Sequence, residues 1–292
     1  MNIGILCHEL GEVESNSLVE AAAKLGHVPI PFTLEEVRFS FDRTGLTARL
    51  GDGYDLQTLD LILSRAKIAA QYSMIDADRY GMLCNLGVPV SDLAGPFLTA
   101  ESKLATMGVL AAAGVPLLAT EVCQDIHELR RAIAACGDAV VKSSFGYGGE
   151  NVMRITGETK SETLAAILDR YGQLLVQEYV PHDEGDYRVT LAGRELLFVA
   201  RRIPNSRSWK ANVSSGADVR IIEHPPEEVC ALGIRAADAL GLFLAGVDIL
   251  PYRDSYVVLE VNNCPGWTDL DRPFKAQVSE RILREAIARV VQ

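Results

Sequence analysis

The most informative stretch of the chain is Lys142-Ser143-Ser144-Phe145-Gly146-Tyr147-Gly148-Gly149-Glu150, a lysine at the end of an apolar run followed by a loop with three glycines. Glycine lets backbone N–H groups approach phosphate oxygens closely, and a lysine ammonium can neutralise their charge. The stretch therefore predicts a phosphate-binding loop, with an ordinary hairpin turn as the alternative. It lacks the Gly-Lys-Ser/Thr ending of a Walker loop, and no G-x-G-x-x-G opens a helix after a strand, which disfavours both of those nucleotide-binding folds.

Three oxygen-bearing side chains near the C-terminal end form a second group. Asp248 ends an expected strand, and Glu260 and Asn262 are two residues apart at the end of the next strand, so the latter two side chains share a face. A carboxylate at the end of a largely apolar strand needs a cation or hydrogen-bond donors to offset its desolvation. These oxygens suit Mg²⁺, which is usually shared with phosphate groups, and a structural salt bridge or hydrogen-bond cluster is the alternative.

Basic residues lie between these two groups. Arg188 falls on an expected strand over residues 187–191, and Arg201 and Arg202 follow another over 196–200. The guanidinium fork suits phosphate and carboxylate oxygens, so arginines on adjacent strands predict an anionic reaction centre. A solvated basic face is the alternative for each of them.

The order of apolar and amphipathic segments predicts a mixed α/β chain. Short strands at 3–6, 28–32 and 59–63 alternate with helical patterns, as in βαβ units around a parallel sheet. Prolines at 29 and 31 confine the second of these strands to a sheet edge, because proline cannot donate to a strand ladder. A new helix is expected to begin near Thr99 and to end at Gly114, and later segments are richer in strands.

Length and composition describe an ordinary globular protein. The chain has 292 residues, of which 48% are hydrophobic and 23% charged, with a formal net charge of -11. The negative charge disfavours nucleic acid and anionic membrane surfaces as partners and favours small molecules. The six cysteines form no CxxC pair, and neither a signal peptide nor an apolar run of membrane-spanning length is evident. We therefore expect reduced thiols and a cytoplasmic location.

Taken in order, these motifs resemble the ATP-grasp superfamily, and specifically its RimK-like amino-acid ligases with their glutathione-synthetase relatives. The resemblance spans nearly the whole chain. It implies an α/β (α+β) ATP-grasp fold, in which an N-terminal parallel α/β pre-ATP-grasp domain (1–93) precedes two α+β subdomains (94–178 and 179–292) that clamp ATP. Related ligases commonly form homodimers or homotetramers, which is the expectation here.

The resemblance also implies the nucleotide contacts. Lys103 and Lys142 match the two nucleotide lysines of the family, Asp186 matches a ribose-contacting acid, and residues 178–180 match the hinge that hydrogen-bonds adenine. With the glycine-rich loop, the expected nucleotide-binding set is Lys103, Lys142, Gly146, Tyr147, Gly148, Gly149, Glu178, Tyr179, Val180 and Asp186.

The same resemblance implies the reaction centre. Arg188 and Arg202 match arginines that bind the phosphoryl group and the developing tetrahedral centre, and Asn212 matches a neighbouring polar contact. The expected ligands of two Mg²⁺ ions, with Mn²⁺ as a substitute, are Asp248, Glu260 and Asn262.

The activity that follows from the resemblance is ATP-dependent carboxylate–amine ligation. An acyl phosphate would form, an amine such as L-glutamate or another amino acid would attack it, and ADP and phosphate would leave. The segments 260–267 and 209–213 depart from the better-known protein-modifying members and look more like a branch that includes the glutamate ligase acting on tetrahydromethanopterin. A phosphotransferase and a non-catalytic nucleotide-binding regulator are the alternatives. Trp209 and Trp267 either line an acceptor pocket or serve packing, and Cys264 is expected to be small filler.

Overall fold

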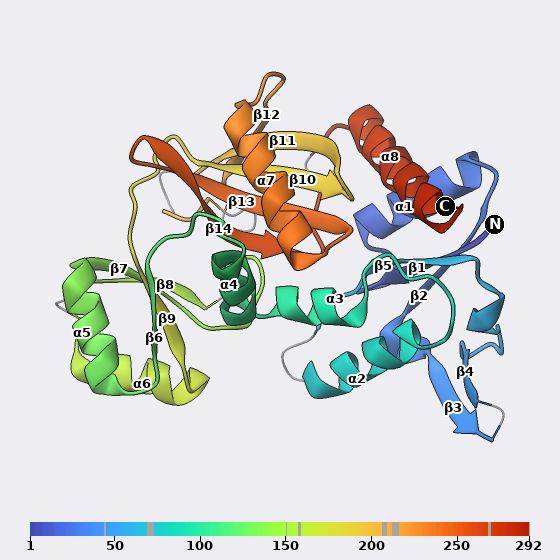
Figure 1. The fold of residues 1–292 in the computed structure, drawn as a ribbon, viewed down its shortest axis with the longest axis horizontal. Helices are drawn as coiled ribbons and strands as arrows, with labels where there is room; N and C mark the ends of the chain where they lie inside the picture. Colours follow the sequence, from blue (N-terminus) through green and yellow to red (C-terminus); the bar gives the residue numbers. More distant parts are fainter. Residues whose placement is uncertain are drawn as a thin grey trace.

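The computed structural model describes residues 1–43, 45–68, 73–149, 151–156, 159–205, 209–211, 216–267 and 270–291. Its strands form a three-stranded parallel sheet, two antiparallel sheets of four and five strands, and a two-stranded hairpin. Figure 1 shows the N-terminal sheet and the four-stranded sheet on opposite sides of the view, with the five-stranded sheet above and between them. Within the described part of the chain, no helix is both long enough and apolar enough to cross a membrane.

The N-terminal sheet has the strand order β2-β1-β5, with β1 at Asn2–Cys7, β2 at Val28–Thr33 and β5 at Leu61–Arg65. Both outer strands pair with β1 in parallel, which confirms the predicted sheet and the edge position of the proline-bearing strand. After its first residue β1 is entirely buried, as a central strand covered on both faces requires. The helix α1 (Val13–Lys24) connects β1 to β2.

A hairpin that the sequence did not indicate follows β2. Its strands β3 (Arg38–Asp42) and β4 (Gly45–Arg49) pair in antiparallel, and most of their side chains are exposed or half-buried. A strand without a buried face lacks the apolar alternation by which strands are recognised. The remaining elements of this part are η1 (Leu34–Glu36), η2 (Leu56–Thr58) and α2 (Ser73–Cys84).

The helix expected to begin near Thr99 is two helices, α3 (Ala94–Glu101) and α4 (Lys103–Ala112). Ser102 separates them, because its backbone is extended and its Oγ accepts a hydrogen bond from the N–H of Ala105 at 3.3 Å. The predicted end at Gly114 is confirmed by its left-handed φ of 67°. The predicted start was wrong, and Lys103 occupies the first position of α4.

The four-stranded sheet has the order β6-β9-β7-β8 and is antiparallel. Its elements are β6 (Thr120–Cys123), α5 (Ile126–Cys136), β7 (Asp138–Lys142), β8 (Val152–Thr156), α6 (Ser161–Tyr171) and β9 (Leu174–Glu178). Both helices cover one face of this sheet over an apolar core (Figure 1). Lys142 ends β7 as predicted, so the glycine-rich loop connects two neighbouring strands.

The five-stranded sheet has the order β12-β11-β10-β13-β14 and is also antiparallel. Its elements are β10 (Asp186–Ala192), β11 (Glu195–Ile203), β12 (Asp218–Ile221), α7 (Glu227–Leu240), β13 (Leu244–Tyr252) and β14 (Ser255–Asn262). The helix α7 packs on one face of this sheet, and side chains of the other face, among them Phe198, Ala200 and Leu244, pack against α8. Asp248 lies in the middle of β13, so its expected place at a strand end was wrong.

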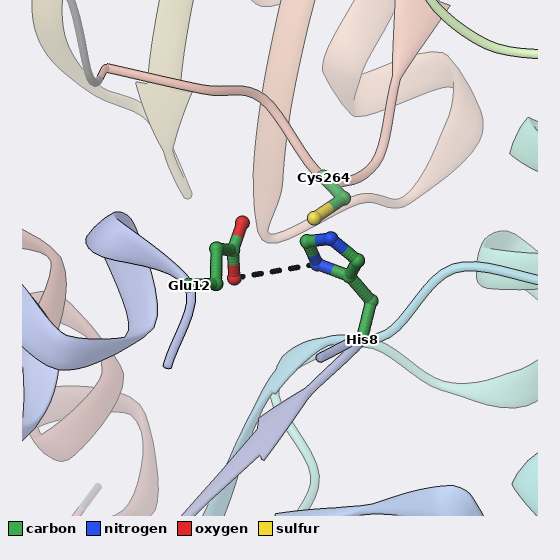
Figure 2. A group of neighbouring side chains, drawn as sticks. All are labelled: His8, Glu12 and Cys264. Carbon is green, nitrogen blue, oxygen red and sulfur yellow. Dashed lines mark ion pairs between the residues drawn. The ribbon is translucent and has the colours of Figure 1, made fainter. Parts of the chain in front are cut away.

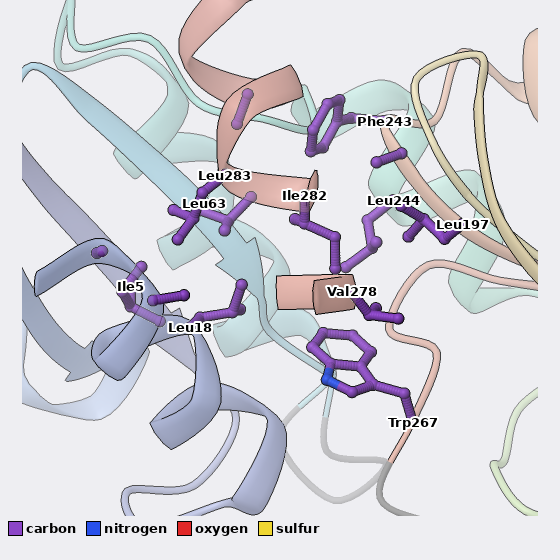
Figure 3. Close-up of a cluster of buried hydrophobic side chains, with 14 of the residues drawn as sticks. Ile5, Leu18, Leu63, Leu197, Phe243, Leu244, Trp267, Val278, Ile282 and Leu283 are labelled. Carbon is purple, nitrogen blue, oxygen red and sulfur yellow. The ribbon is translucent and has the colours of Figure 1, made fainter. Parts of the chain in front are cut away.

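The last helix, α8 (Arg272–Val291), returns to the N-terminal sheet and lies beside α1 (Figure 1). Figure 3 shows the buried cluster between them, in which Ile5 and Leu18 meet Ile282. Trp267 belongs to this cluster and is only 2% exposed. Of its two expected roles, packing is therefore the one that the structure supports.

Candidate active site between the two antiparallel sheets

A pocket lies between the four-stranded and the five-stranded sheet. Its apolar wall comes from both, with Val140 and Val152 on one side and Leu250 and Leu259 on the other. Four basic and four acidic side chains also line it: Lys103, Lys142, Arg202, Lys210, Glu178, Asp186, Asp248 and Glu260. Charges of both signs beside an apolar wall suit a ligand with a flat apolar part and an anionic part that carries a cation.

Strand register brings the predicted arginines and carboxylates together. Arg188 of β10 lies opposite Asp248 of β13, which in turn lies opposite Glu260 of β14. Both Nε and Nη2 of Arg188 donate to the Asp248 carboxylate, with Nη2 at 3.1 Å from Oδ2. Arg202 of β11 lies opposite Asp186 and bridges the two acids, with Nε 2.8 Å from Asp186 and Nη2 2.9 Å from Asp248. The solvated basic face that was the alternative for Arg188 and Arg202 is thereby excluded.

Burial and mutual pairing set the protonation of this array. Burial opposes ionisation of Asp248, but Arg188 and Arg202 outweigh it and lower the pKa of the carboxyl. Burial raises the pKa of Asp186 in spite of its contact with Arg202. The two acids in turn raise the pKa of Arg202 above its ordinary value, although burial opposes them. The Arg202 guanidinium and the Asp248 carboxylate are therefore charged groups that are already desolvated.

The two predicted lysines approach the same place from different elements. Nζ of Lys103 donates to the carbonyl of Gly146 at 2.6 Å and lies 3.4 Å from Glu260. Lys142, at the end of β7, lines the pocket, and burial lowers the pKa of its ammonium to about 8, against the attraction of Glu260. Two ammonium groups near one carboxylate suit a polyanion better than a lone cation.

The glycine-rich loop is held over the pocket by lysines. Besides the bond from Lys103 to Gly146, Nζ of Lys210 donates to the carbonyl of Gly149 at 2.8 Å. Gly146, Gly148 and Gly149 have φ values of 126°, 60° and 78°, a region in which residues with a Cβ are strained. Tyr147 does not line this pocket, because its hydroxyl donates to Glu101 and accepts from the N–H of Ile68 at 3.2 Å.

The predicted hinge at 178–180 lies between β9 and β10 and borders the apolar wall. The Glu178 carboxylate accepts a hydrogen bond from the Tyr252 hydroxyl, and the N–H of Tyr179 donates to the carbonyl of Asp138 at 2.8 Å. Trp209 also lines the pocket, with its ring edge-on to Tyr179 at 5.6 Å. These aromatic and apolar groups line the part of the pocket next to the hinge.

The predicted metal ligands fit a divalent cation by their chemistry. The opposed carboxylates of Asp248 and Glu260 and the amide oxygen of Asn262 are the hard donors that Mg²⁺ prefers. Asn262 ends β14, and its Nδ2 donates to the carbonyl of Gly246 at 3.4 Å, so that bond does not engage its oxygen. Asn212, expected to contact the reaction centre, lies outside the described residues.

Sequence reasoning missed several residues that hold this site together. Lys210 falls in the segment 209–213 and Glu101 lies near the expected helix start at Thr99, but nothing in their spacing indicated that they hold the glycine-rich loop. Asn263, the residue after β14, contacts the partner of Tyr147, because its Nδ2 donates to Glu101 at 2.7 Å. Tyr252, the last residue of β13, donates from its hydroxyl to Glu178 in the hinge. Only the tertiary fold brings these partners within reach.

Comparisons with known proteins agree with this geometry. The model of the RimK-like ATP-grasp domain matches residues 100–286. The tetrahydromethanopterin:alpha-L-glutamate ligase of Methanocaldococcus jannaschii is 31% identical over 207 residues, which cover 68% of this chain and 70% of that protein. The alpha-aminoadipate–LysW ligase LysX of Sulfurisphaera tokodaii is 27% identical, with 98% of both chains covered. A solved RiPP-associated ATP-grasp ligase of Chryseobacterium gregarium, in complex with ADP and a leader and core peptide, has a TM-score of 0.74 at 18% identity, covering 99% of this chain and 97% of that one.

Proposed function

Because the chain belongs to the RimK-like ATP-grasp family, we propose that it is an ATP-dependent ligase that joins an amino acid to a carboxylate through an amide bond, with an acyl phosphate as the intermediate. The ATP-grasp fold expected from the sequence is confirmed. The observation that carries the proposal is the array of Arg188, Asp248 and Arg202 beside Lys103 and Lys142. Phosphoryl transfer followed by acyl transfer needs such pre-oriented charges where negative charge develops.

We place the adenine of ATP against the apolar wall near residues 178–180, and its phosphates toward Lys103, Lys142 and the glycine-rich loop. The contacts of Lys103 and Lys210 with loop carbonyls support this placement, because they hold the loop at the mouth of the pocket. The ribose contact assigned to Asp186 stays a prediction, since its carboxylate is engaged by Arg202 here. Tyr147 is better assigned to holding the loop than to contacting the nucleotide.

The reaction then follows from the charges of the site. The substrate carboxylate attacks the γ-phosphorus of ATP and ADP leaves, while Arg188 and Arg202 stabilise the charge on the transferring group. The amine attacks the acyl carbon, phosphate leaves, and an amide remains. Mg²⁺, when bound by Asp248, Glu260 and Asn262, supplies Lewis-acid neutralisation of phosphate oxygens. Two ions are the proposed number, with Mn²⁺ as a substitute, and Asn212 is the proposed additional polar contact.

A closed glycine-rich loop protects the acyl phosphate from water. The loop is anchored on three sides, by Lys103 at Gly146, by Lys210 at Gly149 and by Tyr147 at Glu101. Glycine at the left-handed positions lets the same loop open for the nucleotide when these contacts are released. Hydrolysis of the intermediate would otherwise compete with attack by the amine.

For the substrates, we propose L-glutamate or another amino acid as the amine and a small-molecule or peptide carboxylate as the acceptor. The support is similarity to a tetrahydromethanopterin:alpha-L-glutamate ligase and to an alpha-aminoadipate–LysW ligase. Nucleic acid and membrane are not proposed as partners. A cytoplasmic location and a homodimer or homotetramer complete the proposal.

The experiment is ADP and phosphate release from MgATP by the purified protein, with amino acids paired with carboxylate acceptors and mass spectrometry of the products. Phosphate release that requires both an acid and an amine, with a new amide mass, is the expected result. Glu260→Gln should abolish release, whereas Glu223→Gln, an exposed carboxylate outside the pocket, should not. Amine-independent release of a phosphorylated product would favour the phosphotransferase instead.

A further inference from the structure

Three side chains with different donor atoms converge outside the pocket. His8 follows β1, Glu12 immediately precedes α1, and Cys264 lies two residues after β14. One ligand atom from each lies within 4.8 Å of the other two. Figure 2 shows the three side chains directed toward one another, with the His8 imidazole between the carboxylate and the sulfur. The group thus joins the N-terminal sheet to the loop that follows β14.

The separation of His8 and Glu12 matches two ligands of one tetrahedral ion. Nδ1 of His8 is 3.3 Å from Oε2 of Glu12, yet within the described residues this buried nitrogen makes no hydrogen bond of good geometry. Zinc–nitrogen and zinc–oxygen bonds of about 2.0–2.1 Å at a tetrahedral angle put two such atoms about 3.3–3.4 Å apart. An ion pair and two zinc ligands share this separation, so both atoms can bind one ion without moving apart.

The surroundings of Glu12 resemble the outer sphere of a metal site. Arg65, only 1% exposed, donates to both carboxylate oxygens of Glu12, and the hydroxyl of Ser15 donates to Oε2. Metal-binding carboxylates are commonly oriented by such donors. The charge of Arg65 opposes a cation, and a Cys264 thiol that loses its proton to the metal would add a second negative charge beside Glu12. The thiol is buried and donates to the carbonyl of Arg65 at 3.4 Å, a hydrogen bond that metal binding would replace.

We propose that His8, Glu12 and Cys264 bind one zinc ion that clamps the N-terminal sheet to the loop after β14. The nitrogen, oxygen and sulfur donor set selects zinc over Mg²⁺ or Ca²⁺, which take oxygen ligands. Three protein ligands leave a fourth position of the tetrahedron for water or another ligand. The site is separate from the predicted Mg²⁺ ligands and does not depend on the ligase proposal.

The test is metal binding by the full-length protein after removal of metals by a chelator. Zn²⁺ is added in excess Mg²⁺, so that the hard oxygen site is filled, and bound zinc is counted after desalting. Co²⁺ replaces Zn²⁺ in a second titration, in which a sulfur-to-cobalt charge-transfer band reports the thiolate. One equivalent of zinc and such a band are expected, and both should persist in Glu260→Gln.

The variants assign the ligands. Cys264→Ser should remove the cobalt band. His8→Gln removes a ligand, so it should weaken zinc binding by at least the ~10–100-fold that is lost when a residue supporting a ligand is changed. Ser15→Ala, which leaves all three ligands in place, should weaken it by about 10-fold. Cys230→Ser and His27→Gln are matched controls outside the group and should bind as the wild type does. Absence of tight zinc binding, or binding unchanged in Cys264→Ser and His8→Gln with native circular dichroism, would overturn the proposal.

Discussion

Replacing Asp92 with asparagine is expected to stabilise the protein at neutral pH but not in mild acid. Asp92 is 1% exposed, and its carboxylate accepts from the N–H of Phe243 at 2.6 Å and from the hydroxyl of Ser91 at 3.1 Å. Burial raises the pKa of its carboxyl from 3.8 to about 6, although these hydrogen bonds oppose the rise. Asparagine has the same shape, can accept from Phe243 and can donate to Ser91, so it removes the buried charge and keeps the contacts.

The sign and size follow from proton linkage. The folded state binds the Asp92 proton more tightly than the unfolded chain, so this group contributes stability that is present below pH 3.8 and lost as the pH rises through about 6. Because a change of one in a pKa corresponds to about 1.36 kcal/mol, the rise in the Asp92 pKa corresponds to about 3 kcal/mol of folding free energy. The free energy of unfolding of Asp92→Asn, relative to the wild type, should therefore increase by up to about 3 kcal/mol between pH 4 and pH 7.

Urea unfolding at pH 4, 5.5 and 7, followed by circular dichroism, measures this difference. Asp254→Asn, the same substitution at an exposed aspartate in the turn between β13 and β14, is the matched control. A constant gap between Asp92→Asn and the wild type across the three pH values would refute the reasoning, because it would mean that Asp92 titrates alike in the folded and unfolded states.

Three further predictions concern the candidate active site. Glu260→Gln should lower kcat by about 100-fold or more with little change in melting temperature, because it removes a carboxylate from the predicted metal site. Lys142→Met should raise the KM for ATP by about 10- to 100-fold, because the variant lacks a charge-assisted phosphate contact. An unchanged KM would show that Lys142 does not bind the nucleotide. Tyr147→Phe should raise the fraction of ATP hydrolysed without amide formation, because the glycine-rich loop loses its hydrogen bond to Glu101. Parallel assays of phosphate and amide would measure this fraction, and an unchanged ratio of amide to phosphate would contradict the prediction.

Local sequence patterns were sufficient to predict structure where a short motif determines it. Lys142 and the glycines after it lie where the apolar run of β7 ends, and both are readable from adjacent residues. The alternation of strands and helices in the first part of the chain predicted a parallel sheet, because a helix that connects two strands of one sheet places them in parallel. The three-part division at residues 93 and 178 stays a prediction.

Pairing between distant residues was not readable in the same way. The sequence placed Arg188 and Asp248 in one centre only through family resemblance, and strand register makes them direct neighbours. Tyr147 was assigned to the nucleotide from its place in the loop, but the structure directs it to Glu101. Ser102 divides a helix because of its cap, a side-chain effect that competes with helical periodicity. In each case a tertiary or side-chain contact outweighs the local pattern.

The arginine–carboxylate array makes folding and catalysis difficult to separate by single substitutions. Arg202 lies between Asp186 and Asp248, so removing it leaves the buried Asp186 without its counter-ion. Breaking such a pair typically costs about 3–5 kcal/mol, which is comparable to the whole stability of many domains. Loss of activity in Arg202→Ala would therefore not assign a catalytic role to Arg202. Glu260 is the better probe, because it lies outside the buried arginine–carboxylate pairs and its partner Lys103 keeps a hydrogen bond to the carbonyl of Gly146.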